Sequence, residues 1–471
     1  MSVDTNNAEF QDALNLIQYT RQSVFLTGKA GTGKSTFLRY VCEHTKKKHV
    51  VLAPTGIAAI NAGGSTMHSF FKLPFYPLLP DDPNLSLQRG RIHEFFKYTK
   101  PHRKLLEQIE LVIIDEISMV RADIIDAIDR ILRVYSHNLR EPFGGKQLLL
   151  VGDVFQLEPV VKNDERDILN RFYPTPYFFS ARVFGQIDLV SIELQKVYRH
   201  TDPVFVSVLD HIRTNTAGAA DLQLLNTRYG SQIEESEADM YITLATRRDT
   251  VDSINEKKLA ELPGDSITFE GVIEGDFPES SLPTSQELVL KPGAQIIFIK
   301  NDFDRRWVNG TIGVIAGIDE EEETIYVITD DGKECDVKLE SWRNIRYHYN
   351  EKTKEIEEEV LGSFTQYPIR LAWAITVHKS QGLTFSRVVI DFTGGVFAGG
   401  QAYVALSRCT SLDGIQLKKP VNRADVFVRP EIVNFAGRFN NRQAIDKALK
   451  QAQADVQYAA ASRAFDKGDM E

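Results

Sequence analysis

Short apolar runs recur along this chain, and each ends in a small or polar residue. Six of them share this form, at residues 23–28, 49–55, 111–116, 148–153, 241–246 and 388–393. They are rich in Val, Ile and Leu. Such runs are typical of strands that are buried on both faces of a sheet and present functional residues at their carboxyl ends.

Helical periodicity fills the spaces between the runs. Before the fourth run, apolar residues stand at 124, 125, 128, 131, 132 and 135, the spacing of one helix face. Alternation of strands and helices predicts an α/β fold with parallel sheets. Two such blocks are visible, at about 1–190 and 191–435. We also interpret the stretch RLAWAIT at 370–376 as helical.

The second block is interrupted by a segment of a different kind. From about 290 to 362, short strand-like runs alternate with Pro-Gly, Asn-Gly, Asp-Gly and Asn-Glu-Lys turns. These turns indicate β-hairpins. The pattern predicts a small antiparallel barrel inserted at 290–362, which divides the second domain into 191–289 and 363–435. A Pro-rich stretch at 74–83 predicts an excursion from the first domain over about 72–100, and the tail at 436–471 is expected to be helical.

Composition narrows the class of protein. The 471 residues include 55 Lys and Arg against 65 Asp and Glu, a net charge of −10. This balance argues against a broad basic face for duplex DNA, but it allows a local basic channel for one strand. No run reaches the roughly 18 apolar residues of a membrane helix, and no secretory signal is visible. We expect a cytoplasmic protein without a membrane partner, whose three Cys form no metal pattern.

Residues 28–35 read GKAGTGKS and match every fixed position of G-x-x-x-x-G-K-[ST], between a strand and a helix-forming run. Backbone N–H groups of such a loop surround phosphate oxygens at a helix N-terminus. Lys34 is expected to reach the β- and γ-phosphates of ATP, and Ser35 to ligate Mg²⁺. The structural alternative is a glycine turn that binds nothing. The predicted nucleotide-binding residues are Gly28, Gly31, Thr32, Gly33, Lys34, Ser35 and Thr36.

The stretch LVIIDEIS supplies a second nucleotide motif. Asp115 ends a predicted strand and is suited to hold Mg²⁺, and Glu116 can orient or deprotonate the attacking water. An acidic pair alone is weak evidence, because acids are common at helix starts. Together with the upstream glycine loop it favours hydrolysis. Gln156, in LLLVGDVFQLEPV, is either a γ-phosphate contact or an ordinary loop residue.

At this point a family resemblance appears. In order, the chain contains GKAGTGKS, APTGIAAINAGGSTMHSFF, IIDEISMV, GDVFQLEPV, LQKVYRH, TVHKSQGLTF and YVALSRCTSLDGI. Together these segments resemble the helicase motifs of superfamily one, 5′-to-3′ branch. The stretch from Met119 through PFGGKQ is similar to the signature of the Pif-one (petite integration frequency) helicases. The resemblance spans about residues 8–415 and implies two RecA-like domains with ATP between them and a Src-homology-three-like barrel.

The resemblance also implies roles for single residues. Gln11 would read adenine, and Arg199 and Arg408 would contact the γ-phosphate from the second domain. Gln381 and Gly382 would link the nucleotide to the strand. An arginine from a second domain makes hydrolysis depend on closure of the cleft, and this turns a chemical cycle into motion. For Arg408 the alternative is a surface arginine at a helix start.

Contacts to single-stranded DNA are expected on both domains. Backbone N–H groups and hydroxyls at strand ends can meet phosphates, and exposed aromatic rings can stack on bases. For Phe70 and its neighbour Phe71, core packing is the alternative, and we expect one of the two to be buried. The predicted contact residues are Pro54, Thr55, Gly56, Met67, His68, Phe70, Thr246, Arg247, His378 and Lys379.

The resemblance implies an ATP- and Mg²⁺-dependent DNA helicase that moves 5′ to 3′ and unwinds forked duplexes, G-quadruplexes and RNA–DNA hybrids in genome maintenance. We expect a monomer in solution, associated with the nucleoid if bacterial. The 74–83 excursion and the signature helix are the candidate wedges. Val154 and Glu158 stand where the family usually has an aromatic residue and a proline, and the glutamate could weaken a strand contact.

Three other functions remain open from the sequence. A RecD- or relaxase-like helicase would act within a larger complex. A DNA-dependent ATPase would grip a strand without separating a duplex. A small-molecule kinase would show no stimulation by single-stranded DNA.

Overall fold

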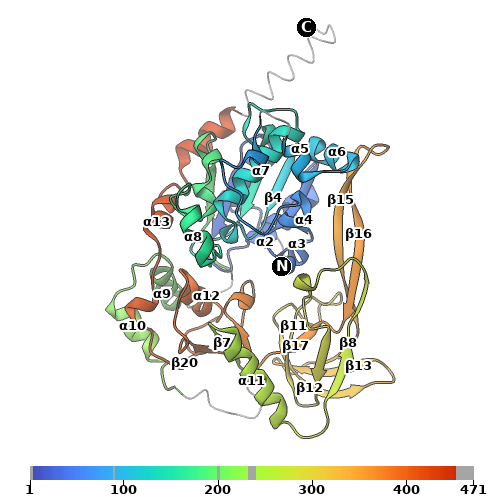
Figure 1. The fold of residues 1–471 in the computed structure, drawn as a ribbon. Helices are drawn as coiled ribbons and strands as arrows, with labels where there is room; N and C mark the ends of the chain where they lie inside the picture. Colours follow the sequence, from blue (N-terminus) through green and yellow to red (C-terminus); the bar gives the residue numbers. More distant parts are fainter. Residues whose placement is uncertain (1–3, 88–90, 199–201, 232–239, 452–471) are drawn as a thin grey trace.

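The computed structural model describes residues 4–87, 91–198, 202–231 and 240–451. Two parallel sheets and an antiparallel region make up the molecule (Figure 1). The predicted α/β fold class with parallel sheets is confirmed. No helix in these ranges is long and apolar enough to cross a bilayer.

The first lobe is built on a six-stranded parallel sheet with the order β3-β2-β4-β5-β1-β6. Alternate residues of its strands face two different cores, so that Phe25 packs on one side and Val24 on the other. Its strands are β1 (Val24–Gly28), β2 (His49–Ala53), β3 (Ser65–Thr66), β4 (Leu111–Ile114), β5 (Gln147–Val151) and β6 (Val190–Leu194). Its helices are α1 (Ala8–Tyr19), α2 (Lys34–His44), α3 (Gly56–Ala62), α4 (Met67–Phe71), α5 (Arg91–Phe96), α6 (Lys100–Gln108), α7 (Ala122–Tyr135) and α8 (Asn163–Leu169).

The second lobe has a four-stranded parallel sheet with the order β18-β7-β19-β20. Its strands are β7 (Ile242–Ala245), β18 (Ala374–Thr376), β19 (Val388–Asp391) and β20 (Ile415–Leu417). Its helices are α9 (Pro203–Arg213), α10 (Ala219–Asn226), α11 (Arg248–Glu261) and α12 (Gln401–Leu406). The helix expected at 370–376 is wrong, because this stretch pairs with β11 at one end and with β7 at the other as two short strands.

The antiparallel region forms three small sheets. Its main sheet has the order β14-β13-β12-β11-β17 and extends beyond the expected limit of 362, because β17 closes its edge. The strands are β8 (Ile267–Glu270), β9 (Val272–Gly275), β10 (Glu287–Leu290), β11 (Gln295–Phe298), β12 (Ile312–Asp319), β13 (Thr324–Thr329), β14 (Glu334–Val337), β15 (Glu340–Asn350), β16 (Glu355–Gln366) and β17 (Ile369–Leu371).

The long β15–β16 hairpin leaves this region and rises along the molecule to α6 of the first lobe (Figure 1). Ile345, Tyr347 and Tyr349 of β15 are buried in the core cluster of the first lobe. The Tyr347 ring lies 6.2 Å from the Phe70 ring, and the Lys48 ammonium lies 5.3 Å from the Tyr349 ring. The hairpin therefore joins the antiparallel region to the first lobe.

After β20 the chain returns to the first lobe along α13 (Pro430–Ala436) and a helical stretch at 442–451. The Phe435 ring stacks 4.3 Å from Phe179. Asn440 pairs with β6, because its side chain accepts from the Glu193 N–H and donates to the Glu193 carbonyl oxygen. Within the tail that was expected to be helical, residues 442–451 form a helix that packs on the first lobe, and residues 452–471 lie outside the described residues.

A candidate nucleotide site beside a strand cleft

Strand β1 delivers a glycine-rich loop to the start of α2. A Cβ on Gly28 would lie 2.8 Å from the carbonyl oxygen of Leu194, so only glycine fits. Gly33 caps α2 with φ of +91°, a conformation that favours glycine. The Lys34 ammonium donates to the carbonyl oxygens of Gly28 and Lys29, at 2.7 and 3.1 Å. The loop thus holds its lysine at a helix N-terminus, where anions bind.

Two carboxylates follow β4 at the same pocket. Glu116 has φ of +50° and ψ of +41°, a left-handed backbone that is uncommon for glutamate and that clusters at active sites. Burial, and then the charge of Asp115, raise the pKa of Glu116 to about 7. Burial also raises the pKa of Asp115. A carboxyl group that titrates near neutrality is suited to take a proton from water.

The opposite wall of the pocket comes from the second lobe. Arg408 follows α12 and is only 1% exposed, so the surface-arginine alternative is wrong. Its guanidinium donates to the carbonyl oxygens of Val404, Ser380 and Leu383, which fix its direction. Its positive charge is close enough to Glu116 to lower the pKa of that carboxyl. Groups of both lobes therefore face one space.

We call this space the nucleotide pocket, a cavity of about 490 Å³. Of the predicted nucleotide residues, Gly28, Gln11 and Gln381 do not line it, and Arg199 lies outside the described residues. The Gln11 amide instead donates to the Thr5 carbonyl oxygen at 2.6 Å. The lining residues are Asp4, Asn7, Phe10, Ala30, Gly31, Thr32, Gly33, Lys34, Ser35, Thr36, Asp115, Glu116, Gly152, Asp153, Gln156, Leu194, Tyr198, Gly382, Thr384 and Arg408.

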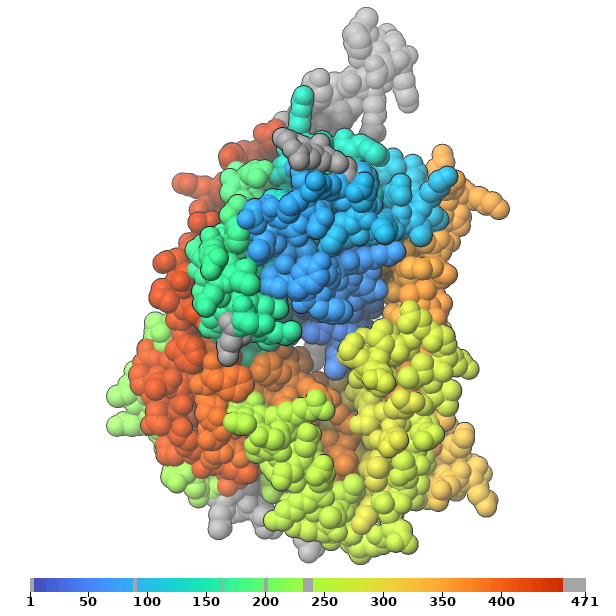
Figure 2. Space-filling model, viewed as in Figure 1, coloured from blue at the N-terminus to red at the C-terminus, as the bar shows by residue number. Residues whose placement is uncertain are grey.

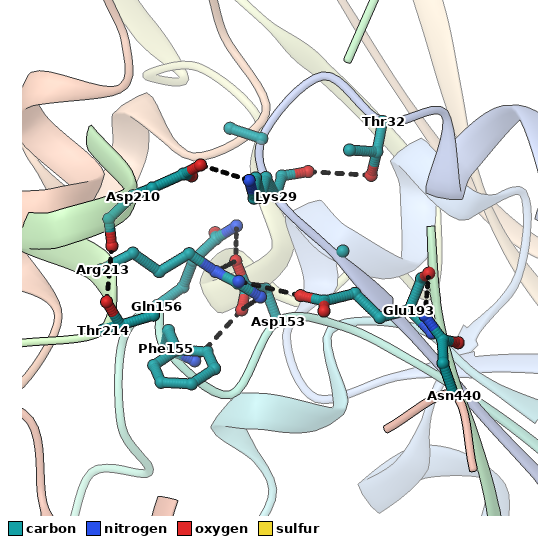
Figure 3. A network of polar contacts seen from close by, with 12 residues as sticks. Lys29, Thr32, Asp153, Phe155, Gln156, Glu193, Asp210, Arg213, Thr214 and Asn440 are labelled. Carbon is teal, nitrogen blue, oxygen red and sulfur yellow. Dashed lines mark hydrogen bonds and ion pairs between the residues drawn. The ribbon is translucent and has the colours of Figure 1, made fainter. Parts of the chain in front are cut away.

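A buried polar network lies behind the pocket and joins the lobes (Figure 3). Arg213, at the end of α9, is 3% exposed and bonds to both oxygens of Asp153, at 3.1 and 3.3 Å. The same guanidinium lies 2.8 Å from the Glu193 carboxylate and 4.4 Å from the Phe155 ring centre. Gln156 in turn donates to Asp153 at 3.4 Å. Sequence reasoning missed Arg213, because its partners lie in the other lobe.

Two further contacts tie the second lobe to the glycine-rich loop. Lys29, within the loop, forms an ion pair with Asp210 of α9 (Figure 3). The Tyr403 hydroxyl of α12 accepts a hydrogen bond from the Ala30 N–H at 3.2 Å. The position of the loop is therefore coupled to two helices of the second lobe.

The nucleotide pocket opens into a second cavity of about 540 Å³, which we call the strand cleft. Figure 2 shows the surface hollowed where the first lobe meets the antiparallel region. Gly382 lines both cavities, and Gln381 lines the cleft. The other cleft residues are Ser35, Leu38, Arg39, Thr55, Ile57, Ala58, Ile60, Asn61, Ala62, Asp115, Glu116, Met119, Pro283, Ile299, Asn301, Asn309, Trp342, Arg370, His378, Lys379 and Leu383.

Comparison with known proteins identifies the family. The model of the PIF1-like helicase family matches residues 5–209. A curated ATP-dependent DNA helicase Pif1 of Campylobacter jejuni is 34% identical, over 84% of this chain and 88% of that protein. The chain belongs to the Pif1 helicase family. The predicted enzyme class, an ATP-dependent DNA helicase, is confirmed.

Solved structures of Pif1 helicases agree with this assignment. A Bacteroides Pif1 in complex with ADP-AlF4 is 41% identical over 91% of this chain and 96% of that chain, with a TM-score of 0.83. A Bacteroides Pif1 bound to ssDNA is 40% identical over 93% and 97% of the two chains, with a TM-score of 0.65. At nearly equal identity, the present Pif1-family chain is therefore arranged more like this complex, and like an unliganded Bacteroides Pif1 with a TM-score of 0.82, than like the ssDNA-bound structure.

Five predicted strand contacts of this Pif1-family protein follow the ends of two strands, with Pro54, Thr55 and Gly56 after β2 and Thr246 and Arg247 after β7. Thr55 caps α3 by accepting from the Ala58 N–H. Thr246 precedes α11, and its buried hydroxyl has no partner among the described residues. Arg247 and Thr246 share a surface hollow with Phe397, which is 61% exposed. Two lobes thus present hydroxyl groups beside helix N-termini.

The aromatic stacking expected on the first lobe is wrong in its details. Met67 and Phe70 are 1% and 3% exposed, because the apolar face of α4 packs into the core, and Phe71 is buried as well. His68 instead stacks on Phe75 at 5.0 Å, and Phe75 is 83% exposed. The sequence signal for Phe75 was an aromatic residue between prolines in the 74–83 excursion.

The signature helix α7 anchors that excursion. Asp123 accepts a hydrogen bond from the Leu78 N–H at 3.1 Å. Arg130 donates to the carbonyl oxygens of Pro80 and Leu85, at 2.6 and 3.3 Å. The two candidate wedges of this Pif1-family chain are therefore one connected unit.

Glu158, which stands where the family usually has a proline, has a structural role. Its carboxylate accepts from the Tyr177 hydroxyl at 3.0 Å and pairs with Arg429 at 2.8 Å. Arg429 caps α13, so Glu158 helps to hold the returning chain on the first lobe. Val154 is fully buried, where an aromatic residue is usual in the family.

Proposed function

We propose that the protein translocates 5′ to 3′ along single-stranded DNA and unwinds forked duplexes by closing its lobes on ATP·Mg²⁺. In this proposal Lys34 holds the β- and γ-phosphates. Ser35 and Asp115 line one pocket with the hydroxyl and carboxylate donors that Mg²⁺ prefers, and they would hold it there. Glu116 activates the attacking water, and Arg408 neutralises charge that develops on the γ-phosphate.

One observation carries the proposal. Glu116 of the first lobe and Arg408 of the second line a single pocket, and Gly382 lines both that pocket and the strand cleft. A change in the distance between the lobes on hydrolysis therefore alters the walls of the cleft at the same time. Such closure and reopening is the repertoire by which ligand binding becomes motion.

The residues expected to contact single-stranded DNA give further support to the proposed translocation. A phosphate at the N-terminus of α11 would give the buried Thr246 hydroxyl the partner that it lacks among the described residues. On the first lobe, a Cβ on Gly56 would lie 2.7 Å from the Cα of Ser281. The turn at Glu279–Ser281 thus covers the start of α3, and it has to move before a strand can reach Thr55 and Gly56.

Finer aspects of the proposal rest on the family resemblance. They include G-quadruplexes and RNA–DNA hybrids as substrates, a role in genome maintenance, action as a monomer, and a cytoplasmic location. Gln156 would hydrogen-bond the γ-phosphate and report its presence, Arg199 would contact it, and Gln11 would read adenine.

A tailed-duplex assay tests the proposal. Duplexes with a 5′ tail, a 3′ tail or no tail are incubated with the protein, with and without ATP·Mg²⁺, and the released strand is measured. Release from the 5′ tail alone is expected, and release from the 3′ tail alone would reject the polarity. Lys34→Ala is expected to lose strand-stimulated hydrolysis while its melting temperature is retained. Strong DNA-stimulated ATPase without strand release would indicate a translocase that does not unwind.

A further inference from the structure

Arg370 of β17 has a buried Nε–H without a hydrogen-bond partner among the described residues. Within the described parts of the chain its side chain makes no hydrogen bond or ion pair. Burial lowers the pKa of its guanidinium to about 10, and no carboxylate offsets this. Arg370 as a whole is partly exposed, so its charge is only partly removed from water, but a buried donor without a partner is uncommon.

The surroundings of Arg370 are also cationic. It lines the strand cleft together with Asn301, Asn309 and Lys379. The positive charge of Arg370 lowers the pKa of Lys379 after the effect of burial, and Arg248 of α11 lowers it further. The two positive charges repel each other, and an anion bound between them would relieve this repulsion.

Within the part of the chain that the structure describes, acidic groups do not fill this role. Asp115 and Glu116 are the carboxylates that line the cleft, and they lie at the end shared with the nucleotide pocket. Asp252 raises the pKa of Lys379, but less than the two arginines lower it, and it does not act on Arg370. The cations therefore form a track that runs from the N-terminus of α11 past Lys379 to Arg370, in a chain of net charge −10.

We propose that Arg370 binds the phosphodiester backbone of single-stranded DNA and extends the second-lobe contacts into the strand cleft. The proposal rests on the proposed translocation along a single strand. A guanidinium presents several donors in a fixed fork, which suits phosphate oxygens without reading the base. Arg370 lies on β17, and Lys379 follows β18, the next strand along the chain. Both cations therefore lie on the same side of the cleft and are expected to move together when the lobes move.

A binding role for Arg370 predicts how its removal changes the stability of the DNA-free protein. If Arg370 awaits an anion, the DNA-free protein bears the cost of a partly buried charge whose Nε–H lacks a partner among the described residues. Removal of the charge in Arg370→Met should then weaken DNA binding and leave the free protein as stable or more stable. An arginine that serves the fold would give the reverse, a lower melting temperature.

The experiment measures binding of an oligothymidine 20-mer by fluorescence anisotropy at several salt concentrations. Arg370→Met is expected to raise Kd about 10-fold and to reduce the slope of log K against log salt by about 0.7. Arg370→Lys should keep the slope and recover part of the affinity. The melting temperature of Arg370→Met should stay level or rise by about 1–3 °C.

Arg343→Met is the matched control. Arg343 is exposed and follows Trp342 on β15, so it points to the opposite face from the cleft, and its loss removes the same charge. A similar fall in affinity for both variants would mean that net charge alone matters, and would overturn the proposal. So would an unchanged Kd for Arg370→Met, or lower melting temperatures for both Arg370 variants. Failure of the translocation proposal is distinguishable, because the wild-type protein would then bind the 20-mer without unwinding 5′-tailed duplexes.

Discussion

Two of the seams that hold the first lobe to the rest of the molecule have opposite chemistry. The polar seam lies behind the nucleotide pocket, where Arg213 and Asp210 of α9 meet Asp153, Glu193 and Lys29. The aromatic seam lies at the other edge of the lobe. There the Tyr347 ring of the hairpin packs against Phe70, which in turn contacts His102, and the Tyr349 ring lies beside Lys48.

The difference teaches how each seam can respond to movement. A buried ion network has one good geometry, because every donor must find its acceptor or leave a charge unpaired. An apolar contact loses little when it slides, because dispersion and burial are not directional. The seam beside the nucleotide is thus the one that fixes a register, and the distant seam is the one that tolerates adjustment.

The largest effect is expected from breaking the polar seam. Arg213→Met leaves Asp153 and Glu193 buried without a cation, at a cost of about 3–5 kcal/mol. Because Asp153 also holds the turn that carries Gln156, strand-stimulated ATP hydrolysis should fall as well. Thermal melting and steady-state ATPase assays measure the two effects. Arg140→Met, at an exposed site, is the control, and equal behaviour of the two variants would contradict the expectation.

Breaking the aromatic seam should have a smaller and more local effect. Tyr347→Ala removes a ring that is 6% exposed, with a loss of about 3 kcal/mol of docking energy. Hydrogen exchange should accelerate across β15 and β16 and remain slow in the first-lobe sheet. High salt should leave the effect unchanged, because the contact that is lost joins two aromatic rings. Tyr326→Ala, at a ring that is 46% exposed, should change little. Exchange that rises equally in the first-lobe sheet would show that the seam is not local.

The stability of the aromatic seam should also depend on pH, because this seam contains a buried histidine, His102. Burial, and then the charge of Lys72, lower the pKa of His102 to about 4, and Arg346 acts in the same direction. The folded state therefore binds fewer protons than the unfolded state below pH 6.5. The part of the stability that depends on a neutral His102 is complete above pH 6.5 and is lost as the pH falls towards 4.

At pH 5 the expected loss is about 2 kcal/mol. Melting temperatures at pH 7 and pH 5 measure it, and His102→Gln should remove this part of the difference. An equal pH dependence in the variant would assign the effect to other groups.

The smallest effect is expected at the Glu158–Arg429 pair. The Arg429 side chain is 39% exposed, and an ion pair in contact with water contributes about 1 kcal/mol or less. Glu158→Gln can keep the hydrogen bond from Tyr177 and should lower the melting temperature by no more than about 2 °C. A much larger loss would show that the returning chain depends on this one pair.

The sequence was informative where local pattern and chemistry coincide. The parallel strands were visible because each is a short apolar run, and the glycine-rich loop was visible because phosphate binding restricts its residues. The residues of the nucleotide pocket were largely predictable for the same reason. RLAWAIT was misassigned because a short apolar run does not distinguish a strand from a helix.

Contacts between distant segments were not predictable. Phe70 and Phe75 are both aromatic residues near the excursion, and only packing decides that one is buried and the other exposed. Arg213 and Arg370 are both arginines in or beside apolar runs. One has two carboxylates from the other lobe, and the other has none among the described residues, which is a fact of tertiary arrangement.

The return of the chain after β20 has a mechanical consequence. The polypeptide crosses between the parallel sheets twice, once ahead of α9 and once ahead of α13, and Asn440 fastens the second crossing to β6. Two covalent crossings restrict rotation of one sheet relative to the other more than a single crossing would. They therefore favour a hinge-like movement for the closure of the lobes that we propose.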